Sequence, residues 1–87
     1  MSIESTIEQF ITDELMFGDV KVKLEPDTPL IANGILDSLA LMRMILFIEE
    51  QFGIKVGDNE LLPGNFQTIN HIKAFVEAKR SVPQGNA

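Results

Sequence analysis

The segment from Leu39 to Ile48 is apolar at every position except Arg43, and this run constrains the fold more than any other part of the chain. A helix made from it has apolar side chains on more than one side, whereas a surface helix normally has a single apolar stripe. The run is about half as long as the roughly 20 residues that cross a membrane. We therefore expect a helix within a small water-soluble domain, with Asp37 as its N-cap and Gly53 as its stop.

The apolar residues of this helix, expected from Ser38 to Phe52, fall into two groups around its axis. With about 100° per residue and Ser38 at zero, the larger group covers an arc of about 100° that contains no charged residue. An arc of this width suits the face of a helix that packs on a protein core. Its members are Leu41, Met44, Ile45, Ile48 and Phe52.

A second, narrower apolar strip lies on another side of the helix, at about 40° to 100°. It could be a second core face if the helix were wrapped on all sides. The rest of the chain offers only short helices to wrap it, and the charged edges need water. We therefore favour an exposed patch rimmed by charge, which is typical of a surface that docks other proteins. The strip consists of Leu39, Met42 and Leu46, and its edges carry Ser38, Arg43, Glu49 and Glu50.

Composition limits the possible partners and chemistry of the chain. Its 87 residues suit one small domain, and 13 acidic against 7 basic residues give a net charge of −6. This balance argues against nucleic acid and favours partners with a basic patch. The absence of cysteine excludes disulfides, thiolate metal sites and a cysteine nucleophile, and we expect no metal. The N-terminus does not resemble a signal peptide. We expect a cytoplasmic monomer that does not bind membranes.

The rest of the chain predicts an all-α bundle with three main helices, one short helix and a long first loop. Apolar spacing predicts helices over residues 2–17 and 68–79, the first of which could begin later because Ser5 and Glu8 form a capping-box pattern. Residues 18–36 are rich in turn formers and are expected to be a loop, although Val20, Val22 and Leu24 alternate like a strand. A short helix is expected within residues 57–67. The domain is assigned to residues 1–80, with a flexible tail at 81–87.

Ser38 stands at the start of the central helix, directly after the expected cap. It could serve only to satisfy backbone N–H groups, although Asp37 can already do this. It could be a nucleophile, but the single histidine of the chain, His71, is far away in sequence. It could also be an attachment point for a phosphate ester, because a helix N-terminus offers free N–H groups and a positive dipole end to an anion.

The segment "DTPLIANGILDSLALMRMILFIEEQFGIKV" resembles the centre of acyl and peptidyl carrier proteins. Asp37, Ser38 and Leu39 match the D-S-L motif that opens the second helix of this family after a long loop. The resemblance continues into "NFQTINHIKAFVE" and covers roughly Ile3 to Val76. It implies the acyl-carrier-protein-like four-helix fold and a non-catalytic carrier. It also implies 4′-phosphopantetheine on Ser38, added from coenzyme A by a phosphopantetheinyl transferase, with the cargo held as an acyl or aminoacyl thioester.

The resemblance further implies that the second helix docks partner enzymes. Besides the transferase, these would be an acyl- or aminoacyl-activating enzyme and downstream synthase, tailoring or thioesterase enzymes. The docking residues carried over by position are Asp37, Leu39, Met42, Leu46, Glu49 and Glu50, with Arg43 among them.

Three features differ from well-known branches of the family. Carriers of primary fatty-acid synthesis often have glutamate at the position of Arg43 and a small residue at that of Phe47, and integrated peptidyl carriers often have histidine at that of Asp37. We therefore expect a freestanding carrier in a specialised polyketide, nonribosomal peptide or modified fatty-acid pathway. Two alternatives are a carrier-like helical adaptor without a prosthetic group and a small serine hydrolase that uses Ser38 and His71.

Overall fold

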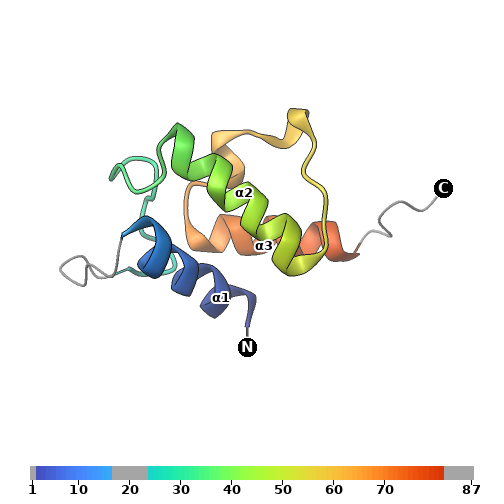
Figure 1. Cartoon of the computed structure of the whole chain (residues 1–87), viewed down its shortest axis with the longest axis horizontal. Coiled ribbons are helices and arrows are strands. Elements are labelled where there is room, and N and C mark those ends of the chain that lie inside the picture. The colour runs from blue at the N-terminus through green and yellow to red at the C-terminus, as the bar shows by residue number, and fades with distance from the viewer. Residues whose placement is uncertain (1, 17–23, 82–87) are drawn as a thin grey trace.

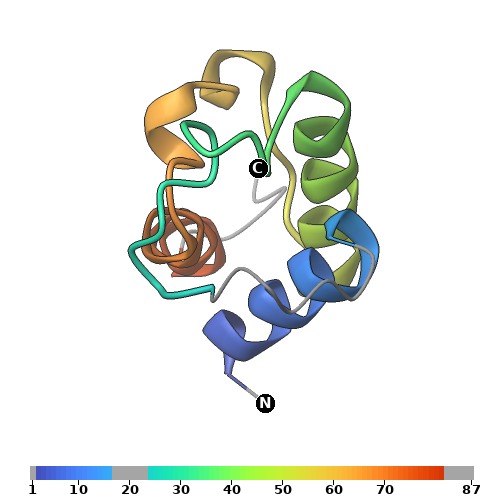
Figure 2. The same ribbon diagram turned by 90° about the vertical axis from the view of Figure 1, so that its left-hand side faces the viewer.

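The computed structural model describes residues 2–16 and 24–81, and these residues form an all-α domain (Figures 1 and 2). Three α-helices are present in this part of the chain: α1 (Ile3–Phe10), α2 (Ser38–Phe52) and α3 (Ile69–Ser81). A π-helical turn, Ile11–Leu15, continues α1. Where one short helix was predicted, two 3₁₀ turns occur, Asp58–Glu60 and Pro63–Asn65. Residues 18–23, which include most of the strand-like alternation, lie outside the described residues.

The first helix begins where the apolar pattern begins. The Ser2 hydroxyl accepts the Ser5 N–H at 3.0 Å and caps α1. The alternative start at Ser5 is therefore wrong, because Ser5 already lies within the first turn. The helix also ends differently from the prediction. Its last turn widens, and the Met16 N–H donates to the Ile11 carbonyl at 2.8 Å, a spacing of five residues instead of four.

Helix α2 has the predicted boundaries because both of its ends are fixed locally. The Asp37 carboxylate accepts the Ala40 N–H at 2.8 Å, which satisfies one of the free donors at the helix start. Gly53 ends the helix with a φ of 65°, a left-handed conformation that glycine adopts without strain. The cap and the stop therefore each lie within one turn of the helix end that they define.

Helix α3 starts after Thr68, as predicted, and its end differs slightly. The Thr68 hydroxyl accepts the His71 N–H at 3.1 Å. The helix continues past the predicted end at Lys79 to Ser81, the first residue that was assigned to the tail. The remaining tail, residues 82–87, lies outside the described residues.

The core lies between the three helices and the long first loop (Figure 2). Of the predicted core face, Met44, Ile45 and Ile48 are buried, whereas Leu41 and Phe52, which lie nearer the two ends of the helix, are partly buried against the same cluster. The other buried apolar residues come from the first helix, the loops and α3: Ile7, Ile11, Leu30, Leu36, Ile54, Phe66, Ile69, Ile72 and Val76.

The first loop is held against the start of α3 before it reaches α2. The Leu30 N–H donates to the Gln67 carbonyl at 2.7 Å, and the Asn70 N–H donates to the Pro26 carbonyl at 3.0 Å. Leu30 is also fully buried, as expected of a loop residue that pins the segment to the core. Figure 2 shows this segment passing α3 on its way to α2. The loop is thus held in place where it leads into Asp37 and Ser38 at the start of α2.

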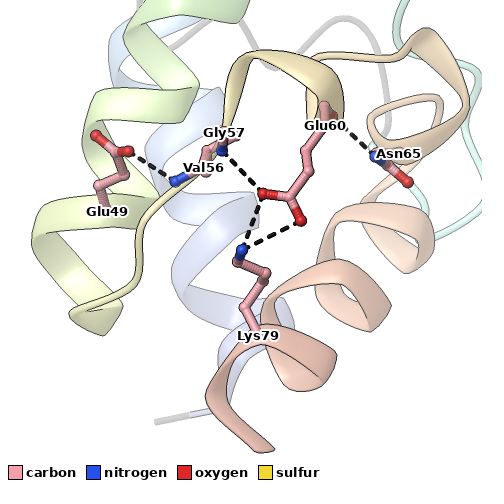
Figure 3. Close-up of polar contacts among 6 residues, drawn as sticks. All are labelled: Glu49, Val56, Gly57, Glu60, Asn65 and Lys79. Carbon is pink, nitrogen blue, oxygen red and sulfur yellow. Dashed lines mark hydrogen bonds and ion pairs between the residues drawn. The ribbon is translucent and has the colours of Figure 1, made fainter. Parts of the chain in front are cut away.

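The connection between α2 and α3 buries Ile54 and Phe66 in the core and also makes polar contacts, several of which centre on Glu60 (Figure 3). The Glu60 carboxylate accepts two bonds from Lys79 Nζ of α3, at 2.8 and 3.1 Å, and one from the Gly57 N–H at 2.8 Å. Its backbone carbonyl accepts Asn65 Nδ2 at 2.9 Å. The hydrogen bond from Lys79, followed by the one from Gly57, lowers the pKa of Glu60 below its usual 4.5.

The burial pattern of α2 predicts that two substitutions on the same helix will have unequal effects. Ile48→Ala removes a fully buried side chain and should lower the free energy of unfolding by about 2–5 kcal/mol. Leu46→Ala acts on a side chain that is 63% exposed and should change it by no more than about 0.5 kcal/mol. Denaturant unfolding followed by circular dichroism measures both, and equal losses would contradict the assignment of the two faces.

The lowered pKa of Glu60 predicts how its contribution to stability depends on pH. Because the carboxylate is favoured in the folded state, its stabilisation is complete above the ordinary pKa of 4.5 and disappears as the pH falls through the lower folded value. The melting temperatures of the wild type and Glu60→Gln should differ at neutral pH and converge on acidification below about 4.5. A difference that stays constant across this range would show that the charge of Glu60 is unimportant.

Candidate attachment site and docking surface

Ser38 is the first residue of α2 and is exposed to solvent. No residue in the described part of the chain forms a hydrogen bond with its hydroxyl. The cap leaves nearby donors free: Asp37 takes the N–H groups of Ala40 and Leu41, and those of Ser38 and Leu39 bond to none of the described residues. A hydroxyl with no partner beside two free N–H groups suits a phosphate ester, because the helix N-terminus attracts an anion.

The His71 side chain contacts Thr68, at the start of its own helix. Its Nδ1 lies 2.7 Å from the Thr68 hydroxyl, so the ring packs over the start of its own helix. Within residues 2–16 and 24–81, neither a histidine nor a carboxylate forms a hydrogen bond with the Ser38 hydroxyl. A serine hydrolase activates its nucleophile through such a contact, so the arrangement does not support the hydrolase alternative.

The second strip of α2 is exposed, as its narrow shape and charged edges predicted. The side chains of Leu39, Met42 and Leu46 are 72%, 49% and 63% exposed, respectively. The alternative in which both apolar faces are buried is therefore wrong. We call these three residues the exposed strip. Leu62, in the connection after α2, is also 56% exposed. Its exposure was not predicted, because the short irregular segment around it has no periodicity.

The charged residues around the exposed strip are not equally available to a partner. Asp37 and Glu50 are exposed. Arg43 instead reaches the π-helical turn, where its guanidinium donates to the Glu14 carboxylate at 3.1 Å and to the Glu14 carbonyl at 3.2 Å. Glu49 accepts the Val56 N–H at 2.9 Å. Of the predicted docking residues, Arg43 and Glu49 thus also hold other parts of the fold.

Phe47 stands where carriers of primary fatty-acid synthesis often have a small residue, and its contacts account for its size. Its ring stacks on that of Phe10, with centroids 4.2 Å apart. This stack and the Arg43–Glu14 pair together tie α2 to the first helix. A surface cavity of about 540 Å³ lies between the same elements, with Gln9, Asp13 and Gln51 in its lining. In the sequence, only the bulk of Phe47 indicated that α2 makes additional contacts on this side.

Among the described residues, no group of three or more histidine or acidic side chains is placed to hold a metal ion. None of the helices in residues 2–16 and 24–81 has both the length and the apolar character to cross a membrane.

Known proteins that resemble the chain agree with this geometry. The family described as "Phosphopantetheine attachment site" matches residues 5–76. A probable acyl carrier protein, PigG, from Serratia sp. is 30% identical over 86 residues, which are 98% of each chain. The D-alanyl carrier protein of Streptococcus pyogenes is 35% identical over 77 residues, covering 88% of this chain and 94% of that protein. The acyl carrier protein of Solidesulfovibrio magneticus is 28% identical, with 92% and 97% covered.

A solved structure has the same fold. It is a crystal structure described as that of an FAD-dependent dehydrogenase, and the matched chain is 31% identical with a TM-score of 0.74. The match covers 80% of this chain and 97% of the other. Because the family match spans most of the domain and includes the helix that begins at Ser38, this chain belongs to the phosphopantetheine-binding carrier proteins, which are non-catalytic.

Proposed function

We propose that Ser38 bears the 4′-phosphopantetheine, and that the chain carries acyl or aminoacyl groups as thioesters on this arm. The observation that supports this is the exposed Ser38 hydroxyl, which bonds to no described residue at the start of α2. Esterification therefore breaks no hydrogen bond within that part of the domain. The free N–H groups of Ser38 and Leu39 lie where a phosphate on this hydroxyl can accept from them.

The prosthetic group supplies a thiol at the end of a flexible arm, which this cysteine-free chain cannot supply itself. The protein fixes the position at which this arm is attached. Asp37 caps α2 and fixes the backbone at the attachment residue, and the loop contact between Leu30 and Gln67 holds the preceding segment. A partner enzyme that recognises α2 then finds the arm at a constant position.

The exposed strip is the proposed docking surface for these partners. Leu39, Met42 and Leu46 present apolar area next to Ser38, and Asp37 and Glu50 add exposed negative charge. A matching enzyme surface would have an apolar depression with basic residues at its edge. We assign this surface to a phosphopantetheinyl transferase, to an acyl- or aminoacyl-activating enzyme, and to downstream synthase, tailoring or thioesterase enzymes.

We further propose that the chain is a freestanding cytoplasmic carrier, working as a monomer in a specialised biosynthetic pathway. The relatives include PigG and D-alanyl carrier proteins, so both acyl and aminoacyl cargo are represented among them. The chain matched in the dehydrogenase structure is of carrier size, since this small domain covers 97% of it. A flavin-dependent dehydrogenase is therefore a partner class to test first.

The attachment site can be tested by intact-mass spectrometry after incubation with coenzyme A and a broad-specificity phosphopantetheinyl transferase. The wild type should gain the mass of one phosphopantetheine, and Ser38→Ala should gain none because the acceptor hydroxyl is gone. Ser5→Ala, which removes an exposed serine from α1, should be modified like the wild type. An unmodified wild type would contradict the proposal and favour the adaptor without a prosthetic group.

The docking role of the exposed strip can be tested with Leu46→Asp, which places a charge in its apolar centre. The kcat/KM of the transferase for this variant should fall at least about tenfold, the size expected when a central contact of an interface is lost. Ala74→Asp, at an exposed position on α3, is the control and should have almost no effect. Both variants should melt close to the temperature of the wild type. If the kcat/KM of Leu46→Asp equals that of the wild type, the exposed strip does not take part in docking.

A further inference from the structure

The surface cavity between α1 and α2 has no role in the proposed function. Its volume of about 540 Å³ lies within the range of about 300–1,000 Å³ that is usual for sites of small organic ligands. Figure 1 shows the two helices side by side. Phe47, in the cavity lining, lies about 100° around the axis of α2 from Leu46. No residue of the exposed strip lines the cavity, so a ligand there does not occupy those side chains.

The apolar part of the lining is aromatic. The rings of Phe10 and Phe47 are stacked with their centroids 4.2 Å apart, and Phe52 adds a third ring. All three side chains are only partly buried, so each keeps surface that a ligand can cover. A ligand that packs here needs an apolar body, because its contacts remove aromatic surface from water.

The polar groups of the lining have mostly acceptors left to offer. Thr6 donates its hydroxyl proton to the Ser2 carbonyl at 2.9 Å, and Gln9 Nε2 donates to Asp13 Oδ2 at 2.6 Å. These bonds leave the Thr6 oxygen, Gln9 Oε1 and Asp13 Oδ1 as acceptors. Gln51, on α2, has an amide that can turn to present its oxygen as well. The lining therefore favours a ligand that donates hydrogen bonds.

The charge at this cavity is negative. Asp13 is exposed, and it forms no ion pair with a described residue. Glu14 is paired through Oε1 with Arg43 at 3.1 Å, so these two charges largely cancel. No lysine or arginine occurs in residues 2–16, and none of the described lining residues is basic. The carboxylate of Asp13 is thus available to attract a cation.

We propose that this cavity is a second binding site, which takes a small organic ammonium ion with an aromatic body. The body packs on the rings of Phe10 and Phe47, and the ammonium group donates to Asp13 Oδ1 and Gln9 Oε1. An ammonium group brings several donors and a positive charge to a lining of acceptors, whereas an anion is repelled by Asp13. The lining extends from Thr6 to Glu14, about 12 Å along the first helix, a length that one small molecule fills.

The site can be tested by an NMR titration of the amide signals with 2-phenylethylamine at neutral pH and low ionic strength. The shifts should saturate with a Kd in the low millimolar range, as expected for so small a ligand. They should be largest at lining residues such as Gln9 and Asp13, and absent at Leu39 and Met42. The neutral analogue 2-phenylethanol should bind at least about threefold more weakly. Equal affinities for the amine and the alcohol, or shifts centred on another surface, would contradict the proposal.

Matched variants test the two parts of the site. Asp13→Asn removes the charge but keeps an oxygen that can accept Gln9 Nε2, and it should bind the amine as weakly as the wild type binds the alcohol. Asp58→Asn removes the same charge from an exposed position in the connection after α2 and should leave the affinity unchanged. Added salt should weaken binding of the amine to the wild type more than to Asp13→Asn, because an ion pair is screened.

Phe47→Leu removes a ring from the lining and should weaken the amine and the alcohol alike, by at least about threefold. If this variant alters the fold, Asp13→Asn still decides, since an affinity for the amine equal to that of the wild type would show that Asp13 does not bind it.

The site is independent of the proposed carrier function. Ser38→Ala should bind the amine like the wild type, because Ser38 does not line the cavity. If the transferase modifies the wild type but the amine does not bind, this proposal is wrong and the carrier function stands. If the amine binds but the transferase modifies nothing, the ligand site stands and the carrier function fails.

Discussion

Burial of one face of α2 is the constraint on which the rest of the structure depends. Met44, Ile45 and Ile48 contribute to the core shared by the first helix and α3, and this fixes the rotation of α2 about its axis. Once that rotation is set, Leu39 and Leu46 must face solvent, because they lie on another side of the same helix. The apolar residues of α2 therefore form two faces that cannot be exchanged: one arc stabilises the domain, and the other is the proposed docking surface.

The contacts between α2 and the first helix follow from the same rotation. Phe47 and Arg43 lie on the side of α2 away from Met42, and there they reach Phe10 and Glu14 of the first helix and its π-helical turn. Arg43 also donates to the Glu14 carbonyl, a favourable place for a cation because the carbonyl end of a helix carries partial negative charge. A residue that by position belonged to the docking surface thus helps to hold the helices together.

Features fixed by neighbouring residues could be predicted from the sequence, and those fixed by distant ones could not. The ends of α2 depend on Asp37 and Gly53, each within a turn of the helix, and its two faces depend only on helical periodicity. By contrast, Arg43 and Glu14 are 29 residues apart, so their pairing depends on how the helices pack. The bond between Glu49 and Val56 crosses the end of a helix and depends on the path of the connection.

These contacts also change what the acidic composition means. The net charge of −6 suggests a broad negative surface for basic partners, yet several carboxylates near α2 already accept internal donors. Asp37 binds the Ala40 N–H, Glu49 the Val56 N–H, and Glu14 the Arg43 guanidinium. The backbone N–H bonds leave the charges of Asp37 and Glu49 in place but restrict how these carboxylates can turn, whereas Glu14 is paired with a cation. In the proposed docking surface, the apolar strip would then be complemented by charges that steer encounter and fix orientation.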